Sequence, residues 1–175
     1  MIPDWLVALI TFPGIVVHEL AHLFFCKLLR VRVLKVCLFR LGDPAGYVIH
    51  EKPDSVYQSL LISVGPFLFN TIAGALMGAL GQGLVFLPEA RGHVSYVLIW
   101  LGVSIAMHAF PSTGDAKAMW QAMWSNGSSA PAKLIGTPLV ILIYAGALGS
   151  IFWMDAIYGI SVAMLLPKLL INLPA

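Results

Sequence analysis

Residues His18-Glu19-Leu20-Ala21-His22 form an HExxH pattern, in which two histidines stand four positions apart. Positions four apart share one face of a helix, so both imidazoles can reach one metal ion. Glu19 lies beside them, where it can take the proton of a water molecule held by that metal. The pattern predicts a site for one Zn²⁺ per chain, with His18 and His22 as ligands and Glu19 as the catalytic base.

This pattern lies inside the apolar stretch from Phe12 to Phe25. Two histidines and a glutamate are costly at hydrocarbon depth, so an ionisable cluster there indicates a functional site. The alternative is a chance HExxH on a packed helix. The membrane context favours chemistry inside the bilayer over this alternative.

The composition is that of an integral membrane protein. Of the 175 residues, 59% are hydrophobic and 10% are charged, whereas an ordinary soluble domain has roughly 25% charged residues. The net charge of +2 is small, and no basic run interleaved with aromatic residues is present, which argues against nucleic acid as a partner. The expected surroundings are a lipid bilayer.

Long uncharged segments predict the membrane-spanning helices, because about 20 apolar residues cross a bilayer. The expected fold is an all-α polytopic membrane protein with about four or five transmembrane helices, forming a single membrane-embedded domain over residues 1–175. Pro13-Gly14 is expected to loosen the first helix just before the HExxH pattern. The helices are expected near residues 5–26, 58–87, 94–111, 134–154 and 156–173.

Residues 31–51 depart from the helical pattern. Val31 to Leu41 is rich in β-branched and apolar residues, Gly42 to Gly46 is a strong turn signal, and Tyr47 to His50 can form a return strand. This predicts a short cytosolic β-hairpin or edge strands near the active site. A plain cytosolic loop with some strand character is the alternative.

Charge placement predicts the orientation of the chain. Most of the lysines and arginines lie between the first and second helices or between the third and fourth. The positive-inside rule then places the N-terminus outside and both basic loops in the cytoplasm of a cell inner or plasma membrane. His22 precedes Arg30 by eight residues, or about 12 Å of helix, so the active site is expected near the cytosolic face.

A zinc hydrolase needs a third protein ligand, and Asp115 is the strongest candidate. It follows an uncharged helix at the same predicted membrane face as the histidines. Asp155 is predicted on the opposite side, and Asp43 and Asp54 belong to the basic loop. The alternative for Asp115 is a capping role at the start of a cytosolic helix.

Together these elements resemble the site-2 protease family of intramembrane zinc metalloproteases. The resemblance rests on His18 to His22, on a Pro-containing segment that ends in Asp115, and on two segments between them. Pro44-Ala45-Gly46-Tyr47-Val48 is similar to the family's Gly-Tyr-Val segment, and Gly65-Pro66-Phe67-Leu68-Phe69-Asn70 to its Gly-Pro…Asn segment. His108 stands roughly where the family commonly has asparagine.

The resemblance implies a minimal member without a PDZ or other regulatory domain. It implies zinc held by His18, His22 and Asp115, and hydrolysis of peptide bonds in transmembrane segments of membrane-protein or signal-peptide-like substrates. It further implies that Asn70, Tyr47 and Val48 contact the substrate, with the strand near residues 33–50 pairing with an extended peptide. The alternative for Asn70 is a hydrogen bond between packed helices.

Two other functions stay open. The first is a non-catalytic membrane protein of the same fold that binds a partner helix or a metal ion, although such a protein has no need of Glu19. The second is a metal-ion transporter, which would need charged residues continuing through several helices. The small-residue face at Gly74 and Gly78 is interpreted as internal packing, with a homodimer through this face as the alternative.

Overall fold

The computed structural model describes residues 3–85, 92–124, 130–149 and 152–171. The described chain is mostly helical and contains a short two-stranded antiparallel sheet, as predicted. The elements are α1 (Asp4–Ile10), α2 (Phe12–Leu28), β1 (Val33–Cys37), β2 (Tyr47–His50), α3 (Val56–Val85), α4 (His93–Met107), α5 (Thr113–Met123), α6 (Ala130–Gly149), α7 (Met154–Ile160), the π-helical segment η2 (Ser161–Leu165) and α8 (Leu166–Ile171).

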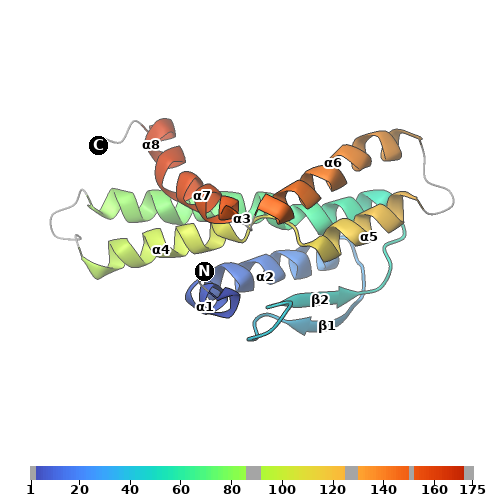
Figure 1. Cartoon of the computed structure of the whole chain (residues 1–175), viewed down its shortest axis with the longest axis horizontal. Coiled ribbons are helices and arrows are strands. Elements are labelled where there is room, and N and C mark those ends of the chain that lie inside the picture. The colour runs from blue at the N-terminus through green and yellow to red at the C-terminus, as the bar shows by residue number, and fades with distance from the viewer. Residues whose placement is uncertain (1–2, 86–91, 125–129, 150–151, 172–175) are drawn as a thin grey trace.

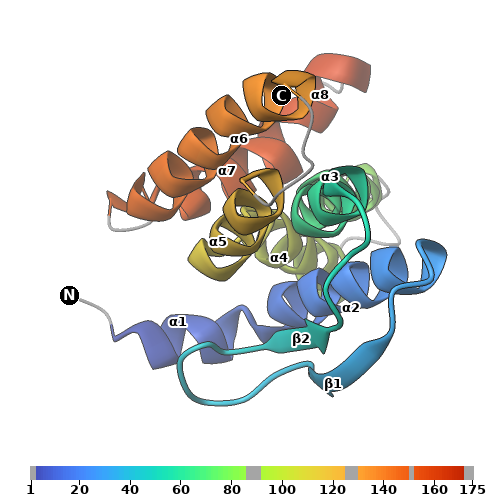
Figure 2. The same ribbon diagram turned by 90° about the vertical axis from the view of Figure 1, so that its right-hand side faces the viewer.

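The long helix α3 is the axis around which the other elements pack. Helix α4 lies along one half of α3 and α5 along the other, so the gap between α4 and α5 falls near the middle of α3 (Figure 1). Helix α2 packs against α3 and α4, and the hairpin covers α2 (Figures 1 and 2). Helices α6, α7 and α8 lie on the side of α3 opposite the hairpin (Figure 2).

Glycines let α3 and α4 approach each other closely. A Cβ atom at Gly102 would lie 2.7 Å from the backbone nitrogen of Gly78 and 2.8 Å from the carbonyl oxygen of Gly74. A Cβ atom at Gly78 would come still closer to the backbone of Ala163 in η2. The face formed by Gly74 and Gly78 is thus used within the chain, in agreement with the internal-packing interpretation. A homodimer through this face would require the packing to open.

The helix predicted over residues 5–26 is two helices, α1 and α2, that run in different directions (Figures 1 and 2). Pro13 is the second residue of α2. Its ring has no N–H to donate and would clash with the carbonyl of Leu9 if α1 continued. The proline therefore breaks the helix at Thr11, a stronger effect than the loosening that was predicted.

The helix predicted over residues 94–111 ends early, at Met107. Pro111 stands four residues after Met107, so the proline ring is incompatible with a continuous helix at this point. The chain resumes as α5, an amphipathic helix that lies outside all five predicted spans. Hydropathy alone misses α5 because residues 113–123 combine Asp115 and Lys117 with apolar positions.

The last two predicted spans need smaller corrections. The span predicted over residues 134–154 is α6, which begins at Ala130, since Lys133 does not stop a helix, and ends at Gly149. The span predicted over residues 156–173 is a succession of α7, η2 and α8. Residues 172 and 173 of that prediction lie outside the described part of the chain.

The predicted hairpin within residues 31–51 is confirmed. Strands β1 and β2 pair with Val33 opposite His50, Val36 opposite Val48 and Cys37 opposite Tyr47. The register shifts between Val33 and Lys35, which indicates a bulge at Leu34.

Among the described residues, α3 is the one helix long and apolar enough to cross a membrane, over Val56–Leu84. Only 33% of its most apolar stretch is buried within the molecule. The core helix of a soluble protein would be mostly buried, so α3 instead turns apolar residues outward. Its exposed large side chains recur at helical spacing along one face, at Leu61, Leu68, Ile72, Leu76 and Leu80.

Candidate metal centre

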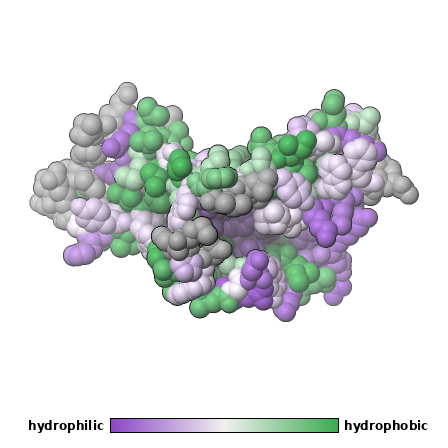
Figure 3. Space-filling view, viewed as in Figure 1, coloured by the Kyte–Doolittle hydropathy of each residue, from purple (hydrophilic) through white to green (hydrophobic). Residues whose placement is uncertain are grey.

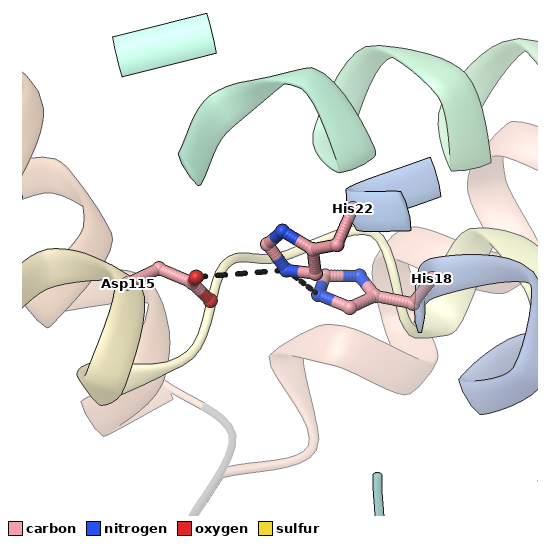
Figure 4. Close-up of side chains that lie close together, drawn as sticks. All are labelled: His18, His22 and Asp115. Carbon is pink, nitrogen blue, oxygen red and sulfur yellow. Dashed lines mark hydrogen bonds and ion pairs between the residues drawn. The ribbon is translucent and has the colours of Figure 1, made fainter. Parts of the chain in front are cut away.

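The two histidines of the HExxH pattern point their Nε2 atoms at each other from one face of α2. The Nε2 atoms of His18 and His22 are 3.1 Å apart (Figure 4). Both residues are buried, at 8% and 6% exposure. The four-residue spacing therefore places both imidazoles on one face of α2, as predicted from the sequence. Their Nε2 atoms are close enough to reach one metal ion.

Asp115 completes the group from an element 93 residues further along the chain than His22. Its Oδ1 atom lies 3.5 Å from His22 Nε2 (Figure 4). The potential ligand atoms of His18, His22 and Asp115 all lie within 4.8 Å of one another. Two imidazole nitrogens and one carboxylate oxygen are the donor set of catalytic zinc sites, so the residues present fit this ion.

The other carboxylate oxygen of Asp115 caps α5. Asp115 Oδ2 accepts hydrogen bonds from the backbone nitrogen of Ser112, at 2.9 Å, and from its hydroxyl, at 2.6 Å. The Asp115 backbone nitrogen in turn lies 3.2 Å from Ser112 Oγ, which completes a capping box. Capping and metal binding were alternative roles for Asp115 in the sequence, and the geometry allows both at once.

A backbone carbonyl lies beside each imidazole. His18 Nδ1 lies 2.7 Å from the carbonyl oxygen of His108, and the carbonyl of Ile62 lies near the His22 ring. Pro66 explains why the Ile62 carbonyl is available, because a proline four residues ahead cannot donate the usual helical hydrogen bond. Such outer partners set the tautomer and ring orientation of metal-binding histidines.

Glu19 lies beside the histidines, under the chain segment that leads into β2. The side chain is 7% exposed. A Cβ atom at Gly46 would lie 2.9 Å from Glu19 Oε1, so only a glycine lets the hairpin backbone come this close. The hairpin is thus positioned directly over the candidate base.

The three residues predicted to contact a substrate fall in two different environments. Tyr47 and Val48 begin β2, next to Gly46, and the Tyr47 ring lies beneath the cationic groups of Lys35 and Arg40. Asn70 is fully buried, at 0% exposure, and its amide nitrogen faces backbone carbonyls. This burial argues against a direct contact between Asn70 and a substrate.

Two features of the site were missed in the sequence. The first is Ser112, which hydrogen-bonds Asp115. The pattern Ser112-Thr-Gly-Asp115, a serine three residues before an acid, is typical of a capping box and could have indicated this role. The carbonyl of His108 holds His18, but a backbone group has no sequence signal. The His108 side chain itself contacts Thr11, with its Nε2 atom 2.8 Å from Thr11 Oγ1.

No protein-family model, curated protein or solved structure matches the chain.

Proposed function

We propose that this protein is an intramembrane zinc endopeptidase of the site-2 protease type. One observation carries the proposal: His18 and His22 converge with Asp115 from a distant helix, beside Glu19. A pair of histidines arises easily on one helix, but a third donor brought from α5 to the same place is the requirement of a catalytic zinc site.

Zinc would be held by His18, His22 and Asp115, and when bound it supplies a Lewis acid and lowers the pKa of water to about 7. Glu19 is placed to take a proton from the attacking water and later to give it to the departing amine. The surrounding helices exclude bulk solvent, which strengthens the electrostatic interactions of these groups.

The proposed setting is a bilayer crossed by several helices. Helix α3 satisfies the length and composition of a span, and α4 and Gly136–Gly146 of α6 are shorter apolar helices. Hydrophobic residues cover the surface over α6 and α7 (Figure 3), including Leu134, Ile141, Leu142 and Ile157. We infer a polytopic protein of the inner or plasma membrane, with the N-terminus outside.

The depth of the site follows from its contacts with α3. Ser63 Oγ donates to the Asp115 carbonyl, and Asn70 donates to the His108 carbonyl. These residues stand seven and fourteen positions after Val56, or about 10 and 21 Å along α3. If α3 enters the hydrocarbon near Val56, the site would then lie around the middle of a core about 30 Å thick.

The proposed substrates are transmembrane segments of membrane proteins or signal-peptide-like sequences. Their peptide bonds must be unwound from a helix before hydrolysis, because helical carbonyls are hydrogen-bonded and shielded. A two-stranded sheet has two unpaired edges, and a strand of extended substrate could add to one of them beside Tyr47 and Val48.

Glu19→Gln tests this function. The amide is nearly the same size, so zinc binding and folding in detergent should be retained. It cannot accept the proton, so cleavage of a transmembrane peptide should fall by about 10²–10⁴-fold. Glu89→Gln, which removes the same charge from the predicted exterior loop, is the control and should cleave normally.

Zinc content is measured by elemental analysis and cleavage by gel or mass spectrometry. Wild-type cleavage by Glu19→Gln would contradict the role of Glu19. A wild-type protein that binds zinc and a membrane peptide but cleaves none would favour the non-catalytic alternative.

A further inference from the structure

Asn70 occupies the middle of α3 and joins three helices through a single amide group. Its Nδ2 atom lies 3.1 Å from the carbonyl oxygens of both Ile105 and His108 at the end of α4, and 3.4 Å from that of Gly14 in α2. Because all three neighbours are acceptors, the atom that faces them must be the amide nitrogen. The Asn70 Oδ1 atom is buried without a hydrogen-bond partner among the described residues.

The carbonyls of Ile105 and His108 need donors because α4 ends at this point. The last carbonyls of a helix lack intrahelical partners. The Ala109 nitrogen, which would continue the ladder to Ile105, instead donates to Ala106. The Ser112 nitrogen, which would serve His108, donates to Asp115. Deep in a helical bundle with no bulk water, such carbonyls require side-chain donors.

The His108 carbonyl is shared between Asn70 and the metal-site histidine. Asn70 Nδ2 lies 3.1 Å from this oxygen and His18 Nδ1 lies 2.7 Å from it. A carbonyl oxygen can only accept, so His18 must carry its proton on Nδ1 to make this hydrogen bond. The Nε2 lone pair of His18 then accepts from His22 Nε2 in the metal-free site and is directed toward His22 and Asp115.

We propose that Asn70 is a positioning residue of the metal centre. Its amide holds the end of α4 against α2 and α3, and the His108 carbonyl fixed there orients His18 for metal binding. The inference rests on the proposed metal site but not on peptide cleavage. Asn70 acts through a backbone group, so its contribution is to the affinity and geometry of the metal.

The test is zinc affinity in detergent, measured by competition with a chelator. Asn70→Leu keeps the side-chain size and removes the donors, and Asn70→Ser is a smaller second variant that leaves room for water. Loss of an outer partner of a metal ligand weakens binding by about 10–100-fold, and this is the expected effect of Asn70→Leu. The Co²⁺ absorption spectrum should also change, because the His18 ring is no longer fixed.

Gln82 provides a matched control on the same helix. It is a second buried amide of α3, with its Nε2 atom 2.8 Å from the Ala163 carbonyl. Its Oε1 atom has no hydrogen-bond partner within the described part of the chain. Gln82→Leu should reduce thermal stability yet retain wild-type zinc affinity and Co²⁺ spectrum. Equal zinc affinities in folded wild-type, Asn70→Leu and Asn70→Ser proteins would overturn the proposal.

A measurement on the unaltered chain covers the case in which the Asn70 variants do not fold. Spectra of ¹⁵N-histidine in the metal-free wild-type protein, assigned with His18→Gln, should show His18 with its proton on Nδ1. The Nε2–H tautomer would overturn the proposal. A wild-type protein that binds no zinc would contradict the proposed function instead, so the two failures are distinguishable.

Discussion

Asp115 shows how one carboxylate can serve both structure and chemistry. Its Oδ2 atom accepts from Ser112 and its Oδ1 atom faces His22. The capping box fixes the side chain, so little conformational freedom remains to be lost when a metal binds. Preorganisation of this kind supports the function of sites that must keep a defined geometry.

The capping box predicts a coupling between Ser112 and the metal. Ser112→Ala removes the hydroxyl that holds Asp115, so zinc should bind about 10-fold more weakly. Stability should fall by about 1 kcal/mol through loss of the N-cap. Ser112→Thr keeps the hydroxyl and should resemble wild type. Chelator competition and thermal unfolding measure the two effects, and unchanged zinc affinity in Ser112→Ala would contradict the coupling.

At the scale of elements, the helix breaks gather around the metal centre. At the break between α1 and α2, the Ser104 hydroxyl hydrogen-bonds the released backbone groups. It lies 3.0 Å from the Gly14 nitrogen, which donates to it, and 2.9 Å from the Thr11 carbonyl, which accepts from it. At the end of α4, the side chains of Asn70 and His18 hydrogen-bond the carbonyl of His108. Irregular backbone inside a membrane protein persists where side chains satisfy the released groups.

Pro66 offers a test of this arrangement within α3. Pro66→Ala restores an N–H group that can bond the Ile62 carbonyl and compete with the His22 ring. Zinc affinity should therefore fall, by about 10-fold if the carbonyl acts as a typical outer partner. Pro138→Ala, at the proline inside α6, is the control and should bind zinc normally. Equal affinities in the two variants would show that the Ile62 carbonyl does not matter.

At the scale of the whole molecule, several described helices expose apolar side chains while a group of polar residues is buried. Large apolar side chains on α3, α6 and α7 face outward, whereas His18, Glu19, His22 and Asn70 are buried. Water would favour the opposite distribution, and a bilayer favours this one. The proposed membrane setting thus explains the surface and the interior together.

The proposed orientation can be tested by labelling introduced cysteines from each side of the membrane, with Cys26 and Cys37 replaced. A cysteine beside Arg32, at the start of the hairpin, should be labelled from the cytoplasm. A cysteine within residues 89–93, in the loop predicted to be exterior, should be labelled from outside. Exterior labelling beside Arg32 would reverse the topology.

The sequence alone determined the parts that depend on local spacing. The four-residue interval between His18 and His22 places both rings on one face of any helix. The turn residues between Gly42 and Gly46 predicted the hairpin. Asp115 could be selected as a candidate ligand by its place at the end of an uncharged segment.

Only the tertiary structure decided which backbone groups lie next to these side chains. Proline positions indicate where a helix is weakened, but whether it bends or ends depends on donors from other helices, such as Ser104 and Asn70. The family resemblance implied that Asn70 contacts the substrate. Its role is set by the carbonyls of Ile105 and His108, which approach from more than thirty residues away and have no sequence signal.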